Sequence, residues 1–375
     1  MSDRTRVGLA ARVLLTAGAL APYWRLLTLS VVFVTDGAFA SDLYNGELPG
    51  RILVGQLVRA GHLPLWTSQL CSGYPLAGAP SDPLGLLLFA LLPPAPALDL
   101  LLIVLLLVAA HGTYALARRF GADRSGAVLA GLGFAGSGYV ATQLQHLSIM
   151  STIVWLPVGL LLIDRLLTAG AGDERRRMLL AATLALVYAN QVLAGFPQAA
   201  YICALVYGSL ALFRVLTPPQ PLVRLRERLP LMAGIAGALT LGAAAGAVVL
   251  LPLSELAGVS DRAGGLDYHW ATFTNFWPWN TLTFFVPYLN GDASDLTYIG
   301  PPPFWENYGY VGGATACLAV YGAIRERRRP LVMFLIAMTA IAFAFMLGPR
   351  TPVYYAAYVL IPGMQRFRAP TRFLL

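Results

Sequence analysis

The sequence predicts an all-α, polytopic membrane protein whose chain crosses the bilayer about nine times, as helices of about 20 residues. Hydrophobic residues make up 57% of the 375 residues and charged residues only 12%, whereas a soluble domain has about 25% charged residues. Apolar runs near the spanning length recur along the chain, so we expect one transmembrane domain over residues 1–375. The predicted spans cover residues 11–34, 97–117, 126–142, 149–168, 178–194, 198–216, 231–253, 308–324 and 330–347.

The placement of arginine predicts the orientation of these spans. All 26 basic residues are arginine, and they gather before the first span and in every second loop after it, whereas the other loops carry most of the acids. Because basic loops stay in the cytoplasm, we expect a cytoplasmic N-terminus and two long extracytoplasmic loops in a cytoplasmic membrane. The net charge of +8 then reflects topology and attraction to the anionic headgroups of the lipid bilayer. No basic patch with interleaved aromatic residues indicates a nucleic acid partner.

The first long outer loop is predicted over residues 35–98, directly after the first span. It begins with acidic residues at the depth where enzymes acting on lipid-linked substrates need polar groups. A helix is predicted around Pro49–Ala60, because its apolar residues repeat at helical spacing, and such a helix suits the membrane interface. Leu84–Leu92 is apolar but too short to span, so we expect a re-entrant or interfacial segment there.

A second long outer loop, residues 255–307, is rich in aromatic residues. Trp and Tyr form belts at membrane interfaces, and they can also line a cleft for a sugar or a polyprenyl chain, so both interpretations stay open. Glu306 at the end of this loop is expected either to orient an acceptor or to pair with an outer arginine. Arg366–Leu375 resembles the start of another span, so we expect the chain to be a fragment or a shortened homologue.

Two further groups of polar residues occur at the predicted outer ends of spans. Their members are Gln143, Gln145 and His146 after the third span, and Asn190, Gln191 and Gln198 where the fifth and sixth spans meet. These side chains could hydrogen-bond the hydroxyls of a sugar. Such residues also commonly satisfy the backbone at helix ends, so the sequence leaves both roles open.

The sequence gives little indication of a metal centre. Its three cysteines are too few and too scattered for a metal or disulfide framework, and it contains no HExxH, P-loop or GxSxG pattern. Asp36 and Asp42 could share a divalent cation with Glu47 or His62. That spacing matches no recognised ligand signature, so a divalent cation is only a possible cofactor.

Several motifs together resemble the YfhO-like family of bacterial membrane proteins, and they cover most of the chain in the expected order. They are Asp42 with Pro49 seven residues on, RAGHLPLW from Arg59, GYPLAG from Gly73, GFPQAAY at Gly195–Tyr201, WPWNTLTFFVPYLNG from Trp277, Glu306 with NYGYVG, and RFRAPTRF from Arg366. The family is similar in architecture to the GT-C glycosyltransferases. The resemblance therefore implies a GT-C-like helical bundle with two long extracytoplasmic loops.

The same resemblance implies an activity and its base. GT-C enzymes take a sugar from a polyprenyl-phosphate-linked donor and transfer it to an acceptor outside the cytoplasm, here a glycan or lipid of the cell envelope. They place an Asp in the first outer loop, where a carboxylate within hydrogen-bond reach can accept the proton of the acceptor. Asp42 begins the matching pattern and is our candidate for this catalytic base. Asp36, which lies closer to the membrane in the sequence, is the alternative.

The donor phosphate needs cations, and arginine holds phosphate through two parallel hydrogen bonds. Arg366, Arg368 and Arg372 are the main candidates, because the span count places them outside, against the positive-inside trend. Arg51, Arg59 and His62 of the first outer loop are weaker candidates for the same substrate.

Two other functions compete with glycosyl transfer. A flippase or transporter of a lipid-linked sugar should carry its binding site near the midplane, on broken helices within inverted repeats. In this sequence the polar groups gather at the outer surface, and no inverted repeat is evident. The third hypothesis is a non-catalytic partner in glycan assembly, which would bind such a lipid without turnover.

Overall fold

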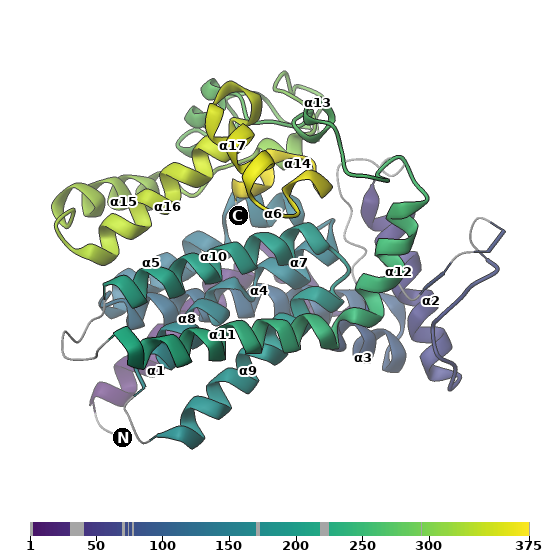
Figure 1. The fold of residues 1–375 in the computed structure, drawn as a ribbon, viewed down its shortest axis with the longest axis horizontal. Helices are drawn as coiled ribbons and strands as arrows, with labels where there is room; N and C mark the ends of the chain where they lie inside the picture. Colours follow the sequence, from purple (N-terminus) through teal and green to yellow (C-terminus); the bar gives the residue numbers. More distant parts are fainter. Residues whose placement is uncertain are drawn as a thin grey trace. The chain divides into compact units, whose positions relative to one another are not determined.

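The computed structural model describes residues 3–30, 41–69, 72–73, 75–76, 79–169, 173–217, 225–293 and 295–374. Within these ranges the regular elements are helices, joined by turns and loops of varied length (Figure 1). The predicted all-helical class is therefore confirmed for the described residues. Asp36, the alternative candidate for the base, lies outside them.

Contacts between residues divide the chain into two compact units. Unit 1 comprises residues 1–135 and 144–253, and unit 2 comprises residues 136–143 and 254–375. Each unit is described by itself below, and the single transmembrane domain over residues 1–375 stays a prediction.

Unit 1 is a bundle of helices in which the longest members lie side by side (Figure 1). α4 packs against α1, α3, α5 and α8, and α9 packs against α8 and α11. The helices are α1 (Asp3–Leu20), α2 (Leu48–Arg59), α3 (Pro83–Leu91), α4 (Pro94–Arg119), α5 (Arg124–Ala135), α7 (Leu147–Ile153), α8 (Leu156–Leu167), α9 (Glu174–Leu193), α10 (Pro197–Leu216) and α11 (Leu225–Ala245), while α12 (Ala247–Gly258) reaches from unit 1 into unit 2.

Small residues allow these helices to approach closely. A Cβ atom on Gly131 of α5 would lie 2.6 Å from the carbonyl oxygen of Ala110 in α4. A Cβ atom on Gly242 of α11 would lie 2.7 Å from the carbonyl oxygen of Ala185 in α9. Close backbone approach at glycine is a common packing mode of helices in membranes, and Gly131 and Gly242 provide it here.

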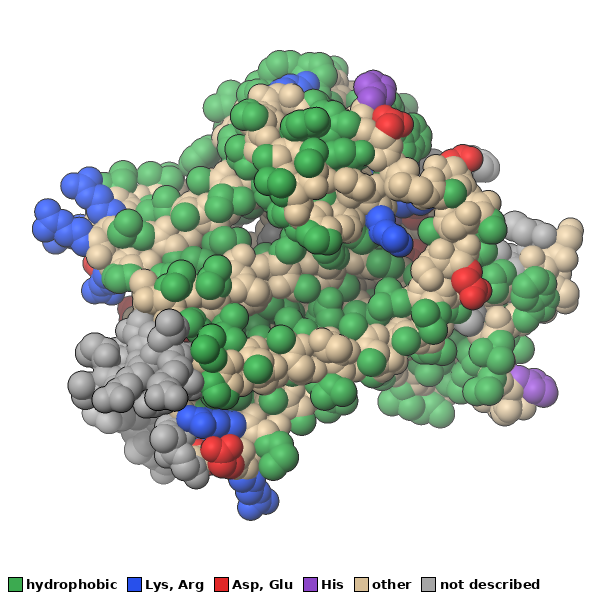
Figure 2. All heavy atoms as spheres, viewed as in Figure 1, with side chains coloured by type: hydrophobic (Ala, Val, Ile, Leu, Met, Phe, Trp, Pro, Cys, Tyr) green, Lys and Arg blue, Asp and Glu red, His purple; other side chains and the backbone are tan. Residues whose placement is uncertain are grey.

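Three described helical segments are long and apolar enough to cross a membrane, namely Pro94–Arg119 (α4), Leu147–Leu167 (α7 together with α8) and Pro197–Leu216 (α10). A fourth candidate is the pair Leu229–Ala245 and Ala247–Gly258, which is bent by 70°. These four correspond to the predicted spans 97–117, 149–168, 198–216 and 231–253. Many leucines on the outer faces of the helices are exposed, including Leu186 at 71%, Leu212 at 53% and Leu241 at 67%, and hydrophobic side chains cover much of the face seen in Figure 2.

The described residues thus provide fewer candidate spans than the nine that the sequence predicts. The predicted span 126–142 is divided by a break between α5 and α6 (Gly138–Gln143). The predicted span 11–34 begins as α1 but leaves the α-helical geometry at Ala21, where Pro22 starts a 3-10 turn. Arginines at the start of α9 interrupt its apolar run, and α15 (Gly313–Arg325) has only 13 residues. Apolar composition alone did not reveal these breaks.

Two short helices follow the first predicted span, as the sequence indicates. The predicted helix around Pro49–Ala60 is confirmed as α2, and the apolar segment Leu84–Leu92 forms α3. The two helices pack so closely that a Cβ atom on Gly55 would lie 2.4 Å from the carbonyl oxygen of Phe89. Arg59 donates from Nε to the carbonyl of Ala90 at 2.8 Å. α2 and α3 therefore pack directly against each other.

Unit 2 joins the second predicted outer loop to the C-terminal helices. Its interior includes the fully buried Phe276, which stacks on Phe284 with ring centroids 5.7 Å apart. Nearer the surface, the ring centroid of Tyr268 lies 5.1 Å from that of Tyr355, which is exposed, and 5.3 Å from that of Tyr358. Its helices are α6, α13 (Tyr268–Ala271), α14 (Phe304–Asn307), α15, α16 (Pro330–Met346) and α17 (Pro352–Leu360), with 3-10 turns at Pro278–Phe284, Gly348–Arg350, Met364–Arg366 and Pro370–Leu374.

Candidate functional site

A cluster of charged side chains gathers in unit 1 at the start of the first predicted outer loop. We call Asp42, Glu47, Arg51, Asp82, His146 and Ser148 the acidic cluster. A π-helical turn, Leu43–Glu47, leads into α2. Because its hydrogen bonds join residues five apart, Asp42 and Glu47 stack on one side of the chain. Arg51 follows Glu47 at helical i,i+4 spacing and continues this face.

Asp42 forms the exposed end of this cluster. Its Oδ2 lies 3.0 Å from Nε2 of His146, the residue that precedes α7. The Asp42 side chain is 65% exposed, whereas that of His146 is only 10% exposed. A buried imidazole thus holds a carboxylate that a bound hydroxyl group could reach. This is the arrangement expected of a general base with an orienting partner.

Glu47 occupies the buried middle of the cluster. Ser148 donates to its carboxylate from Oγ at 2.7 Å and from the backbone nitrogen at 3.3 Å, and Nε of Arg51 lies 4.0 Å away. Burial raises the pKa of the Glu47 carboxyl above its ordinary value of 4.5, and the charge of Arg51 and the Ser148 hydrogen bonds oppose that rise. Glu47 thereby ties the π-helical turn to the start of α7.

The inner end of the cluster is an ion pair removed from solvent. Nη1 of Arg51 lies 2.5 Å from Oδ1 of Asp82, and both side chains are only 2% exposed. The other oxygen of Asp82 accepts from the backbone nitrogen of Gly85 at 2.9 Å, so Asp82 also caps α3. A Cβ atom on Gly85 would lie 2.3 Å from Nη1 of Arg51. Only glycine at this position leaves room for the pair.

Substitution of Glu47 by Gln should change how stability depends on pH. A carboxyl group with a raised pKa keeps its proton in the folded state above pH 4.5, where the unfolded state has released it. The wild type should therefore lose stability as the pH rises from about 4.5 through the raised pKa. The Glu47→Gln variant should lack this loss, because its amide does not titrate and still accepts from Ser148.

Melting temperatures of detergent-solubilised wild type and Glu47→Gln, measured at pH values from about 4 to about 8, which begin near the ordinary carboxyl pKa and extend above it, test this expectation. Groups that the two proteins share contribute to both curves, so the difference between the curves isolates the side chain at position 47. Parallel curves for the two proteins would contradict the expectation, because they would show that ionisation of Glu47 does not lower the stability of the folded state.

Unit 2 contains a second charged group, which we call the arginine cluster and define as Arg262, Arg368, Arg372 and Glu306. Arg372 donates to Oε1 of Glu306 from Nε at 2.9 Å, and its Nη2 lies 2.8 Å from the same oxygen. The guanidinium of Arg368 lies 5.9 Å from the centre of the Trp270 ring. Burial and the positive charges of Arg368 and Arg372 lower the pKa of Arg262. The cluster thus contains three arginines and one carboxylate, which pairs with Arg372.

This cluster decides between the two roles expected of Glu306, because its carboxylate pairs with Arg372. Arg366 is exposed in the 3-10 turn Met364–Arg366. Arg262 was missed from the sequence. Its signal is an arginine inside a predicted outer loop, which opposes the same positive-inside trend that singled out Arg368.

The remaining predicted residues have mainly structural surroundings. The guanidinium of Arg59 donates to carbonyls at the end of α3, at 2.8 and 3.2 Å. His62 is exposed in the turn after α2, and Gln198 is buried at the start of α10. Gln143 donates to the carbonyl of Trp305 at 3.2 Å.

Gln191 also serves the backbone, because it donates to the carbonyl of Thr152 at 2.9 Å. For Gln143 and Gln191 the structure therefore supports the backbone-satisfying role. Among the described residues, no three His, Cys, Asp or Glu side chains come together in a way that could hold a metal ion.

No protein-family model, no curated protein and no solved structure matches this chain.

Proposed function

We propose that the protein is a GT-C-type glycosyltransferase of the bacterial cytoplasmic membrane. It would move a sugar from a polyprenyl-phosphate donor to an extracytoplasmic glycan or lipid of the cell envelope. The observation that carries the proposal is the exposed carboxylate of Asp42, held by buried His146 at the start of the first predicted outer loop. The candidate membrane-spanning helices and the resemblance of the motifs to YfhO-like proteins support it.

In this proposal Asp42 acts on the acceptor. Its carboxylate accepts the proton of an acceptor hydroxyl while the hydroxyl oxygen forms a bond to the anomeric carbon of the sugar. The bond from that carbon to the phosphate oxygen breaks, and its electron pair leaves with the polyprenyl phosphate. His146 is a positioning residue, because its Nε2 fixes the orientation of the carboxylate at 3.0 Å. Attack from the side opposite the phosphate inverts the anomeric centre.

The arginine cluster of unit 2 is proposed, on its own chemistry, to bind a lipid-linked phosphate. Its three arginines exceed its one carboxylate, and arginine binds phosphate through two parallel hydrogen bonds. Arg372 donates two N–H groups to Glu306. Arg368 is exposed and lies beside Trp270, so it is the member proposed to meet a phosphate.

Substitution of Arg368 by Gln should raise the Kd for polyprenyl phosphate by about 10- to 100-fold, because a hydrogen bond to a charged group contributes about 1.5–3 kcal/mol. Titration of the purified protein with polyprenyl phosphate measures this constant. Arg327→Gln is a matched control, because Arg327 is an exposed arginine in the turn between α15 and α16 of the same unit. An unchanged Kd in Arg368→Gln would remove Arg368 from the phosphate site.

The direct test of the proposed function uses purified protein in proteoliposomes with a panel of radiolabelled polyprenyl-phosphate sugars. Transfer of label to an envelope acceptor with at least one donor is the expected result.

A transporter is the second candidate, and the 70° bend between Leu229–Ala245 and Ala247–Gly258 favours it, because transporters bind substrates at discontinuous helices. Label that reaches the opposite leaflet on its original lipid would identify such a flippase. Binding without transfer or movement would identify a non-catalytic partner in glycan assembly.

A further inference from the structure

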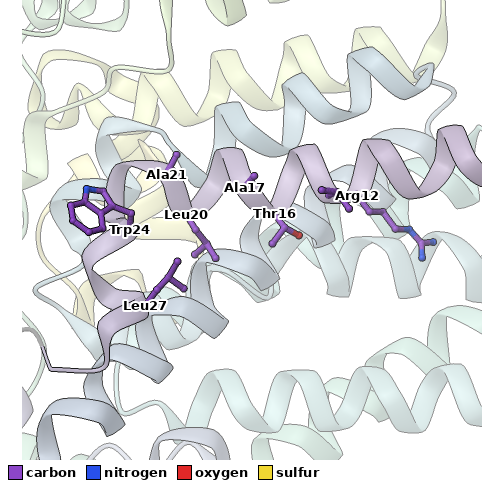
Figure 3. Close-up of a pocket in the computed structure, with 8 residues that line it drawn as sticks. Arg12, Thr16, Ala17, Leu20, Ala21, Trp24 and Leu27 are labelled. Atoms are coloured by element: carbon purple, nitrogen blue, oxygen red, sulfur yellow. The ribbon is translucent and has the colours of Figure 1, made fainter.

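A shallow groove runs along α1 and the 3-10 turn Ala21–Thr28, and none of its lining residues belongs to the acidic cluster or the arginine cluster. Its volume is about 530 Å³. Figure 3 shows Arg12 at one end, Trp24 and Leu27 at the other, and Thr16 and Leu20 between them. The departure from α-helical geometry at Ala21 bends this segment and gives the groove its concave side.

The groove is lined mostly by apolar side chains and by one cation. Arg12 is the only charged residue among those that line it, and Arg12 is exposed and forms no ion pair with any residue that the structure describes. The hydroxyl of Thr16 lies 2.9 Å from Nε2 of His111, so this polar group is already engaged. The groove therefore suits a ligand with an anionic head and an apolar tail.

The length of the groove matches one leaflet of a bilayer. From Arg12 to Trp24 the chain rises about 18–20 Å, at 1.5 Å per α-helical residue and 2.0 Å per 3-10 residue. One leaflet contributes about half of the ~30 Å hydrocarbon core. A cation at the headgroup level and a groove of this length fit a single extended acyl chain.

We propose that this groove binds one anionic phospholipid of the leaflet in which Arg12 lies, with its phosphate on Arg12 and an acyl chain along Ala17 and Leu20 towards Trp24. The inference goes beyond sugar transfer and rests only on the placement of the chain in a membrane. Leu20 is 9% exposed and forms the floor, whereas Trp24 is 60% exposed and forms a wall at the far end. Arg25 is not the proposed anchor, because its guanidinium lies 5.7 Å from the centre of the Trp24 ring.

Trp24 provides the probe for a test with brominated lipids, which quench tryptophan on contact. The protein has seven tryptophans, so the difference in emission between wild type and Trp24→Phe isolates Trp24. Reconstituted protein is titrated with brominated phosphatidylglycerol or brominated phosphatidylcholine of the same chain length. Half-quenching of Trp24 should need about fivefold less of the anionic lipid, the factor expected for one arginine near an anionic headgroup.

Substitution of Arg12 by Gln should bring the two quenching curves together. Arg165→Gln, a matched control at an exposed arginine of α8 outside the groove, should leave their separation intact. Curves that coincide in the wild type, or that stay apart in Arg12→Gln, would overturn the proposal. Loss of the separation in Arg25→Gln alone would place the headgroup at the opposite end and would also overturn it.

Quenching of the other tryptophans while Trp24 stays unquenched would show that something other than lipid covers the groove, such as a second copy of the chain. If no tryptophan is quenched, the chain does not lie in the bilayer, and the lipid site fails with that premise. Neither outcome depends on sugar transfer. The quenching measurement therefore tests the lipid site independently of the transfer assay that tests the proposed enzyme.

Discussion

Substitution of Asp42 by Asn is expected to lower the rate of sugar transfer by about 10²- to 10⁴-fold, the usual contribution of a general base. Asn has the shape of Asp and can still hydrogen-bond Nε2 of His146, so the fold should survive. It cannot accept the acceptor proton, however, and the loss should fall on kcat. Initial rates of transfer in proteoliposomes, with the melting temperature as a check on folding, measure the effect.

The control for this substitution is Asp261→Asn. Asp261 is an exposed acid of the second predicted outer loop and lies outside both clusters, so its variant should transfer at the wild-type rate. His146→Gln should lower the rate by less than Asp42→Asn, because the base remains while its orientation is lost. A fully active Asp42→Asn enzyme would move the base elsewhere, with Asp36 as the next candidate.

Substitution of Asp82 by Ala should destabilise the protein by about 3–5 kcal/mol, the range for removing one partner of a buried ion pair. The guanidinium of Arg51, only 2% exposed, would keep its charge in an environment without the carboxylate that now lies 2.5 Å away. The same change removes the cap on the backbone nitrogen of Gly85. Unfolding by denaturant in detergent, compared between wild type and variant, measures the loss.

Two further variants divide this effect into its parts. Asp82→Asn keeps an oxygen to cap Gly85 but lacks the charge, so its stability should resemble that of Asp82→Ala more closely than that of the wild type. Glu326→Ala is the matched control, because it breaks the exposed pair of Glu326 with Arg329, and exposed pairs contribute only about 0–1 kcal/mol. If Asp82→Ala costs no more than Glu326→Ala, the Arg51–Asp82 pair is not a structural anchor.

The elements that depend on local pattern could be predicted from the sequence. The helical spacing of apolar residues predicted α2. The apolar segment that forms α3 was distinguished from a membrane span by its short length. The number of spans was harder to predict, because the breaks after Ala135 and Leu20 arise from local backbone geometry. Apolar composition stays continuous through both breaks, so hydropathy does not register them.

The contacts that build the two clusters could not be predicted. Asp42 and His146 are 104 residues apart in the chain, and Glu306 and Arg372 are 66 apart. Asp42, His146, Glu306 and Arg372 were each visible in the sequence as a polar residue at a predicted outer position. Their pairing depends on how the helices pack, and no local pattern encodes that packing.

The central claim, that this protein transfers a sugar off a polyprenyl phosphate, is tested most directly by product analysis in proteoliposomes. A donor labelled in both the sugar and the lipid phosphate is incubated with the protein and an extracytoplasmic acceptor. The proposal predicts equal amounts of glycosylated acceptor and sugar-free polyprenyl phosphate, both dependent on the acceptor. Donor that crosses the bilayer with its sugar still attached, and no sugar on the acceptor, would contradict it.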